Sequence, residues 1–188
     1  MCSSPHRRAS VAAPFLLCLA LAGCQPPAAG GAAAPGGEVS ETKVMAASEP
    51  ARIELGAEPV TVAVPLRPED NERLLQAAAE PGRLRLAIEG LQLLRPGRAY
   101  EVYLNLPEGA APDPKGPHFL GLVALYAPAG DPAETTRSFD LAPAVQALRE
   151  RGRWPGEVKV TLVPADGDKV AAAAGPFLRF RRLVLYTR

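Results

Sequence analysis

A strict alternation of side chains between residues 98 and 106 constrains the fold of this chain more than any other feature. Tyr100, Val102 and Leu104 fall on one face of an extended segment, and the residues between them fall on the other. A period of two built from aromatic and β-branched residues is typical of a strand with one buried face. Proline and glycine bound the segment, where they favour turns. We therefore expect this segment to form the centre of a β core.

Segments with a strand-like composition recur along the rest of the chain, separated by stretches rich in proline and glycine. The segment at 118–126 is almost entirely apolar, which favours a strand buried on both faces. Together these segments predict an all-β fold, an antiparallel β-sandwich of about seven strands with one short helix. The expected strands cover residues 59–65, 83–93, 98–106, 118–126, 137–141, 156–164 and 177–186.

The one expected helix begins after Asp140 and ends near Gly152. Three apolar side chains at helical spacing form a single stripe along this segment. Asp140 suits a helix cap, and Gly152 suits the C-terminal end. Earlier in the chain, residues 68–79 fit either a helical turn or a solvated loop.

The first 23 residues have the layout of an export signal. Arg7 and Arg8 precede an apolar run at 11–22, which is shorter than the roughly 20 residues that a membrane span needs. The run ends in the letters LAGC, similar to the lipobox of bacterial lipoproteins, in which the cysteine becomes an acylated N-terminus. Cys24 is therefore the predicted lipid attachment site. The alternative is an ordinary cleaved signal with an incidental cysteine.

A lipid on Cys24 would anchor the chain in a membrane of the cell envelope, because each buried methylene contributes about 0.8 kcal/mol. Gln25, and not aspartate, follows the cysteine, so retention at the inner membrane is not specifically indicated. In a Gram-negative cell we expect the periplasm or the outer-membrane face. The other two cysteines, Cys2 and Cys18, lie in the leader, so we expect no disulfide and no catalytic thiol in the mature chain.

Alanine, glycine and proline dominate residues 24–50, which carry no apolar periodicity. This composition predicts a flexible tether, followed by one domain at 51–188. The whole chain has 21 basic and 20 acidic residues. A nucleic-acid partner would require a basic surface, so we expect none.

Four short motifs follow one another in the predicted domain: IEGL at 88–91, YEVYLN at 100–105, FLG at 119–121 and VTLVP at 160–164. Their order resembles that in the C-terminal domain of plant-type polyphenol oxidases and related bacterial tyrosinases, a domain known for its Lys-Phe-Asp-Val motif. At that motif the chain departs from the family, since residues 99–101 read Ala-Tyr-Glu.

The resemblance covers about residues 59–188 and implies a β-sandwich without the separate helical domain that holds copper through six histidines. This chain has two histidines, His6 and His118, whereas each metal of a copper pair requires about three nitrogen ligands. We therefore expect a non-catalytic cap or interaction module without a cofactor of its own. The resemblance implies a tyrosinase-type copper oxidase as its partner.

His118 and Phe119 open a predicted strand after a proline-rich loop at 108–117, and they are the candidate contacts with a partner or a metal. Alternatively, His118 is an exposed imidazole at a strand end, because a lone histidine rarely holds a metal. His118, Met45 and scattered carboxylates also leave open a second function, a copper- or small-molecule-binding periplasmic lipoprotein.

Three arginines, Arg179, Arg181 and Arg182, lie close together near the end of the chain. Two interpretations remain open for them. They form a patch that grips an acidic partner, or they form a solvated face that protects the edge of a sheet.

Overall fold

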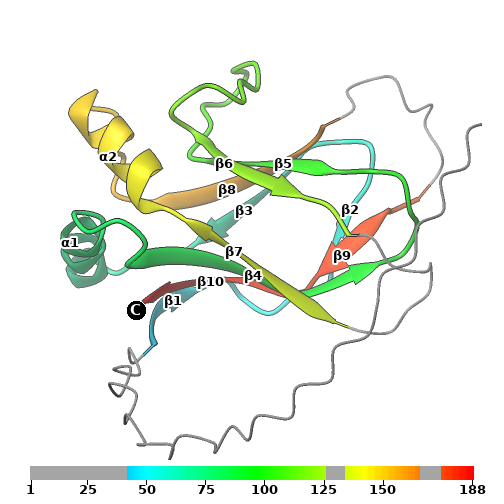
Figure 1. Ribbon diagram of the computed structural model, residues 1–188, viewed down its shortest axis with the longest axis horizontal. Coiled ribbons are helices and arrows are strands. Elements are labelled where there is room, and N and C mark those ends of the chain that lie inside the picture. Colours follow the sequence, from blue (N-terminus) through cyan, green and yellow to red (C-terminus); the bar gives the residue numbers. More distant parts are fainter. Residues whose placement is uncertain (1–41, 126–133, 166–174) are drawn as a thin grey trace, which may run out of the picture. The chain divides into compact units, whose positions relative to one another are not determined.

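Two antiparallel sheets in a curled sandwich form the body of the domain, and both helices lie at one end of it (Figure 1). The computed structural model describes residues 42–125, 134–165 and 175–188, within a unit that spans Val39–Arg188. In chain order the elements are β1 (Lys43–Ala47), β2 (Ile53–Leu55), β3 (Val60–Val64), α1 (Pro68–Ala77), β4 (Leu84–Leu93), β5 (Tyr100–Leu104), β6 (Phe119–Val123), β7 (Thr135–Asp140), α2 (Ala142–Glu150), β8 (Val158–Pro164), β9 (Leu178–Phe180) and β10 (Arg182–Thr187).

The long strand β4 organises the first sheet. Its neighbours in order are β1-β10-β4-β9-β2, and β7 also pairs with β4. Residues 84–89 of β4 pair with β10, whereas Gln92 and Leu93 pair with β9. Gly90 lies at this change of partner with φ +69°, and the register with β7 shifts between Ile88 and Leu91. A bulge at a glycine bends the strand, so one strand serves two differently oriented neighbours.

The second sheet has the order β3-β8-β5-β6 and places β5 at its centre, which confirms the expectation for residues 98–106. Tyr100, Val102 and Leu104 are fully buried against the apolar face of the first sheet. Burial of a side chain of this size contributes about 1.5–3 kcal/mol. Tyr103, on the opposite face, is also fully buried, so β5 is covered on both sides.

The all-β sandwich is confirmed, with ten strands and two helices among the described residues. The predicted strand at 177–186 is two strands, β9 and β10, divided at Arg181. Residues 68–79, left open between a helical turn and a loop, contain α1, whose first residue is Pro68. Leu141 occupies the cap position of α2, but the Asp140 carboxylate still accepts the N–H of Ala142 at 3.0 Å.

Two expectations from composition were wrong about where a strand lies. β6 is an edge strand with one partner, β5, and Leu122 is 56% exposed; it is not buried on both faces. β1 lies inside the range 24–50 that the composition predicts as a tether, and it is a strand because it pairs with β10.

Cys24 and the signal segment at 1–23 lie outside the described residues. Within residues 42–125, 134–165 and 175–188, no helix is long and apolar enough to cross a membrane.

Candidate functional site

A groove of about 860 Å³ lies on the outer side of the second sheet, at the base of the segment that joins β5 to β6. Thr61 of β3 and Thr161 of β8 line the groove, and a hydrogen bond of 2.9 Å links their two hydroxyl groups. Lys159 and Glu157 form an ion pair of 2.7 Å at its side. The remaining lining of the groove is mainly proline and the β5–β6 segment.

Asn105 determines how the chain leaves the sheet at this groove. Its φ is +48°, in a region that non-glycine residues rarely adopt and that asparagine tolerates best. Its backbone N–H donates to the Lys159 oxygen at 2.8 Å, and its side-chain Nδ2 donates to the Glu157 oxygen at 2.8 Å. The asparagine therefore extends the β5–β8 pairing past the end of β5 while it turns the backbone outward.

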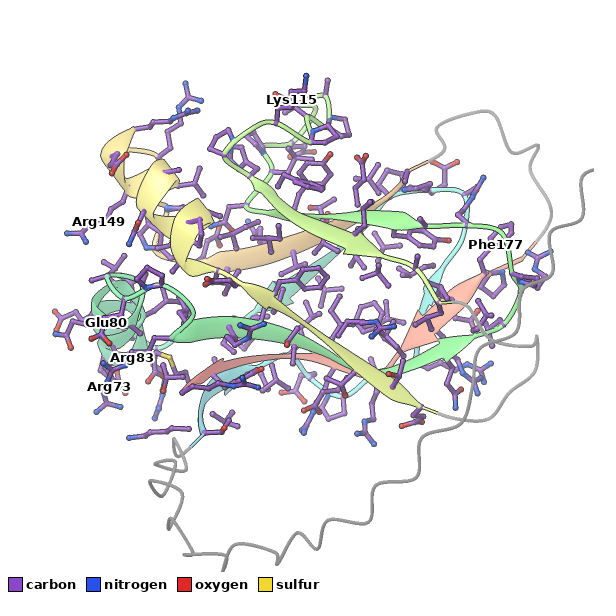
Figure 2. The ribbon with its side chains drawn as sticks, in the orientation of Figure 1. Arg73, Glu80, Arg83, Lys115, Arg149 and Phe177 are labelled. Carbon is purple, nitrogen blue, oxygen red and sulfur yellow. The ribbon has the colours of Figure 1, made fainter. Side chains whose placement is uncertain are left out.

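The segment at 106–117 then projects from the sandwich, and Figure 2 shows Lys115 at its outer end. Residues 107–115 are exposed, yet the segment is closed by its own hydrogen bonds. The Asp113 carboxylate accepts the N–H of Lys115 at 2.9 Å, and the Asp113 carbonyl accepts the N–H of Gly116 at 2.9 Å. We call residues 106–117 the projecting loop. Such local bonds give a polar loop a defined shape.

Two aromatic rings support the base of the projecting loop. The rings of Tyr103 and Phe119 lie 5.5 Å apart between centroids, at an angle of 58°. The Tyr103 hydroxyl donates to Glu101 Oε2 at 2.5 Å. Burial, and then this hydrogen bond to a carboxylate, raise the pKa of Tyr103 above its ordinary value. The phenol is therefore a neutral donor at physiological pH, and it positions Glu101 beside the aromatic pair.

His118 is half-buried and lines both the groove and a smaller hollow of about 210 Å³ beneath the loop. Its Nδ1 lies 2.8 Å from the Leu104 carbonyl oxygen. A carbonyl only accepts, so Nδ1 carries the proton of this hydrogen bond. The imidazole is consequently anchored to β5, and at the start of β6 it is half-buried, whereas the alternative interpretation expected it to be exposed.

The structure brings together only part of the site predicted from the sequence. His118 faces the groove, and Phe119 packs on Tyr103 beneath the loop. Met45 lines a different hollow, beside α1, so it does not join His118 in a copper site. Among the residues that the structure describes, no group of three or more His, Cys, Asp or Glu side chains is placed to hold a metal ion. Sequence reasoning missed Asn105, whose only signal is its position between a strand and a proline-rich loop.

Comparison with solved structures finds similar domains in two longer proteins. Latent apple tyrosinase matches with a TM-score of 0.51 at 19% identity, over 73% of this chain and 28% of that chain. Recombinantly expressed latent aurone synthase, a polyphenol oxidase, gives 0.47 at 18% identity, over 73% and 26%. The chain thus spans about a quarter of these longer proteins. The domain has the fold of the C-terminal domain region of a plant tyrosinase, as the sequence motifs implied.

Comparison by sequence gives a family as well. No curated protein matches the sequence at the significance required. Residues 41–175 match a family model described as Domain of unknown function (DUF7868). That range includes β1 through β8, the groove and the projecting loop. Because the match covers well over half of the sequence, the chain belongs to the DUF7868 family.

Proposed function

We propose that this protein is a non-catalytic interaction module, held at a membrane by an acylated Cys24, that docks on a partner protein through the projecting loop and the groove. One observation carries the proposal: an exposed loop with a defined shape stands beside a large hollow, and Asn105 holds its base in an uncommon backbone conformation. Uncommon backbone held by surrounding bonds often marks a functional position.

The hydrogen bonds of the loop favour docking over a passive connection. A loop that is already shaped before binding loses less conformational entropy when a partner orders it. The bonds at Asp113 and Asn105 supply this shape from within the chain. The loop tip, with Lys115, offers the exposed surface, and the half-buried imidazole of His118 lines the groove at the base.

We infer that the partner is a tyrosinase-type copper oxidase. In latent apple tyrosinase this fold accounts for 28% of a longer chain, and the rest of that protein is not matched here. A separate protein that contains the unmatched part is therefore the kind of partner that this similarity suggests. His118 is the only imidazole among the described residues, so any chemistry on copper would belong to the partner.

A photo-crosslinking amino acid in place of Lys115 tests the docking surface in the cells that make the protein. We expect a crosslinked product that contains a copper oxidase. The matched control places the same group at Glu72, an exposed position of α1, where we expect no such product. Equal yields from both positions, or products that contain only this chain, would contradict the proposal.

A further inference from the structure

A second hollow, of about 430 Å³, lies where β4 changes partner from β10 to β9. Three arginines line it, Arg52, Arg179 and Arg181, together with one carboxylate, Glu134. We call this set the arginine hollow. It has no residue in common with the groove.

The glycine bulge of β4 builds the floor of the arginine hollow. A Cβ at Gly90 would lie 2.8 Å from the Arg181 Cβ, so only glycine permits this approach. The Arg181 N–H donates to the Glu89 oxygen at 2.9 Å, and the Arg181 oxygen accepts the Ala51 N–H at 2.9 Å. The backbone of Arg181 is therefore fixed on both sides, while its side chain is exposed at the hollow.

Arg179 is positioned by its cross-strand neighbours. It pairs with Glu54 of β2 on one side and with Gln92 of β4 on the other. Its Nε donates to Gln92 Oε1 at 2.5 Å. The Glu54 carboxylate is bonded instead to Arg52 Nε, at 2.9 Å. Within residues 42–125, 134–165 and 175–188, no hydrogen bond or ion pair involves the two terminal nitrogens of Arg179, and the neutral amide of Gln92 orients the group without cancelling its charge.

The arginine hollow has more positive charge than its own carboxylates neutralise. Glu54 pairs with Arg52, but among the described residues no carboxylate lies within ion-pair distance of Arg179 or Arg181. Glu134 sits over the bulge, since a Cβ at Gly90 would lie 3.4 Å from its Oε2. Two guanidinium groups, of which that of Arg179 is held by Gln92, and one nearby carboxylate leave a local excess of positive charge.

We propose that the arginine hollow binds a phosphate group, with Arg179 and Arg181 as its ligands. Guanidinium forks match the oxygens of phosphate and carboxylate alike. A phosphate monoester carries about −1.5 to −2 charges near pH 7 and three strong acceptor oxygens, so it can accept hydrogen bonds from both guanidinium groups at once, whereas a carboxylate has two oxygens and Glu134 opposes either anion. The phosphate comes either from a small soluble molecule or from a lipid headgroup, and the proposal does not depend on docking at the groove.

Titration of the full chain with inorganic phosphate, followed through its backbone amide resonances, tests the site. We expect saturable shifts at residues 90 and 179–181, absent when chloride replaces phosphate at equal ionic strength. Arg181→Gln and Arg179→Gln each weaken binding about tenfold, the size of one lost charge-assisted hydrogen bond. Glu134→Gln has the opposite effect and tightens binding a few-fold, because it removes a negative charge that would repel the negatively charged phosphate.

Arg149→Gln is the matched control, because Arg149 is an exposed arginine of α2 outside the hollow. We expect no change in this variant. Shifts that persist unchanged in the Arg179→Gln, Arg181→Gln double variant would overturn the proposal, as would a Glu134→Gln variant that binds more weakly. Cosedimentation of a Cys24→Ser chain with phosphatidic acid vesicles separates the sources. Vesicle binding that Arg181→Gln abolishes identifies a lipid headgroup, and phosphate binding without vesicle binding identifies a soluble ligand.

Discussion

The backbone N–H of Lys159 donates a hydrogen bond of 2.7 Å to the side-chain oxygen of Asn105, one residue after β5 has ended. A side chain thereby replaces the backbone group that the next residue of a strand would have provided. The amide pair of asparagine both accepts from β8 and donates to it. The projecting loop thus begins at a point that is bonded to the sheet as firmly as the strand itself.

Asn105→Ala is expected to lower the free energy of unfolding by about 2 kcal/mol, since it removes two side-chain hydrogen bonds and leaves a methyl group at positive φ. Urea unfolding measures this change. Asn105→Gly is the control, because it loses the same hydrogen bonds but adopts the positive φ without strain. If alanine were no worse than glycine, backbone strain would not contribute at this position.

Gly121→Ala is expected to destabilise the domain by about 1–3 kcal/mol through overpacking and backbone strain. Gly121 has φ +148°, and a Cβ there would lie 3.0 Å from the ring of Phe139. Unfolding of Gly121→Ala alone and combined with Phe139→Leu gives the coupling between the two sites. We expect the smaller side chain to recover part of the loss. If the free-energy changes of the two substitutions simply added in the double variant, the cost of Gly121→Ala would come from backbone strain alone.

High pH is expected to destabilise the domain through two buried tyrosines. Burial raises the pKa of Tyr100 to about 12, and burial with the Glu101 hydrogen bond raises the pKa of Tyr103 as well. The unfolded phenols ionise near pH 10, so their contribution is intact below that pH and is lost as pH rises through the folded pKa values. We expect the melting temperature to fall above pH 10, and less steeply in Tyr103→Phe. Melting curves recorded beside tyrosinate absorbance measure both.

Cys24→Ser is expected to move the protein from the membrane fraction to the soluble fraction of its cells. The reason is the loss of the proposed acyl chains, each with about 0.8 kcal/mol per buried methylene. Fractionation and the mass of the N-terminal peptide measure the change. Gln25→Asn keeps the cysteine and is the control. A Cys24→Ser protein that stays with the membrane would contradict the lipid anchor.

The alternating strands could be predicted because their signal is local. Burial of Tyr100 and Val102 follows from a period of two, and α2 follows from an apolar stripe. The place of a strand in a sheet is a tertiary property. Nothing in the composition of residues 43–47 predicts that they pair with β10, and nothing in the apolar run at 119–123 predicts that it lies at an edge.

The candidate site could be predicted in its components but not in its geometry. His118 and Phe119 were identified from their place after a loop, and both lie at the base of that loop. The sequence does not reveal that Asn105 adopts a positive φ, because that conformation depends on partners in β8, more than fifty residues away. It also does not reveal the bulge at Gly90 that brings Arg181 to its hollow.

β10 lies between β1 and β4, so the last strand of the chain is inserted into the middle of a sheet. Lys43 of β1 and Thr187 of β10 are direct cross-strand neighbours in this arrangement. During synthesis, β1 therefore cannot take its place in this sheet until residues 182–187 have been made. The pairing of β1 with β10 therefore joins two segments separated by most of the sequence, and such long-range pairing forms late in folding.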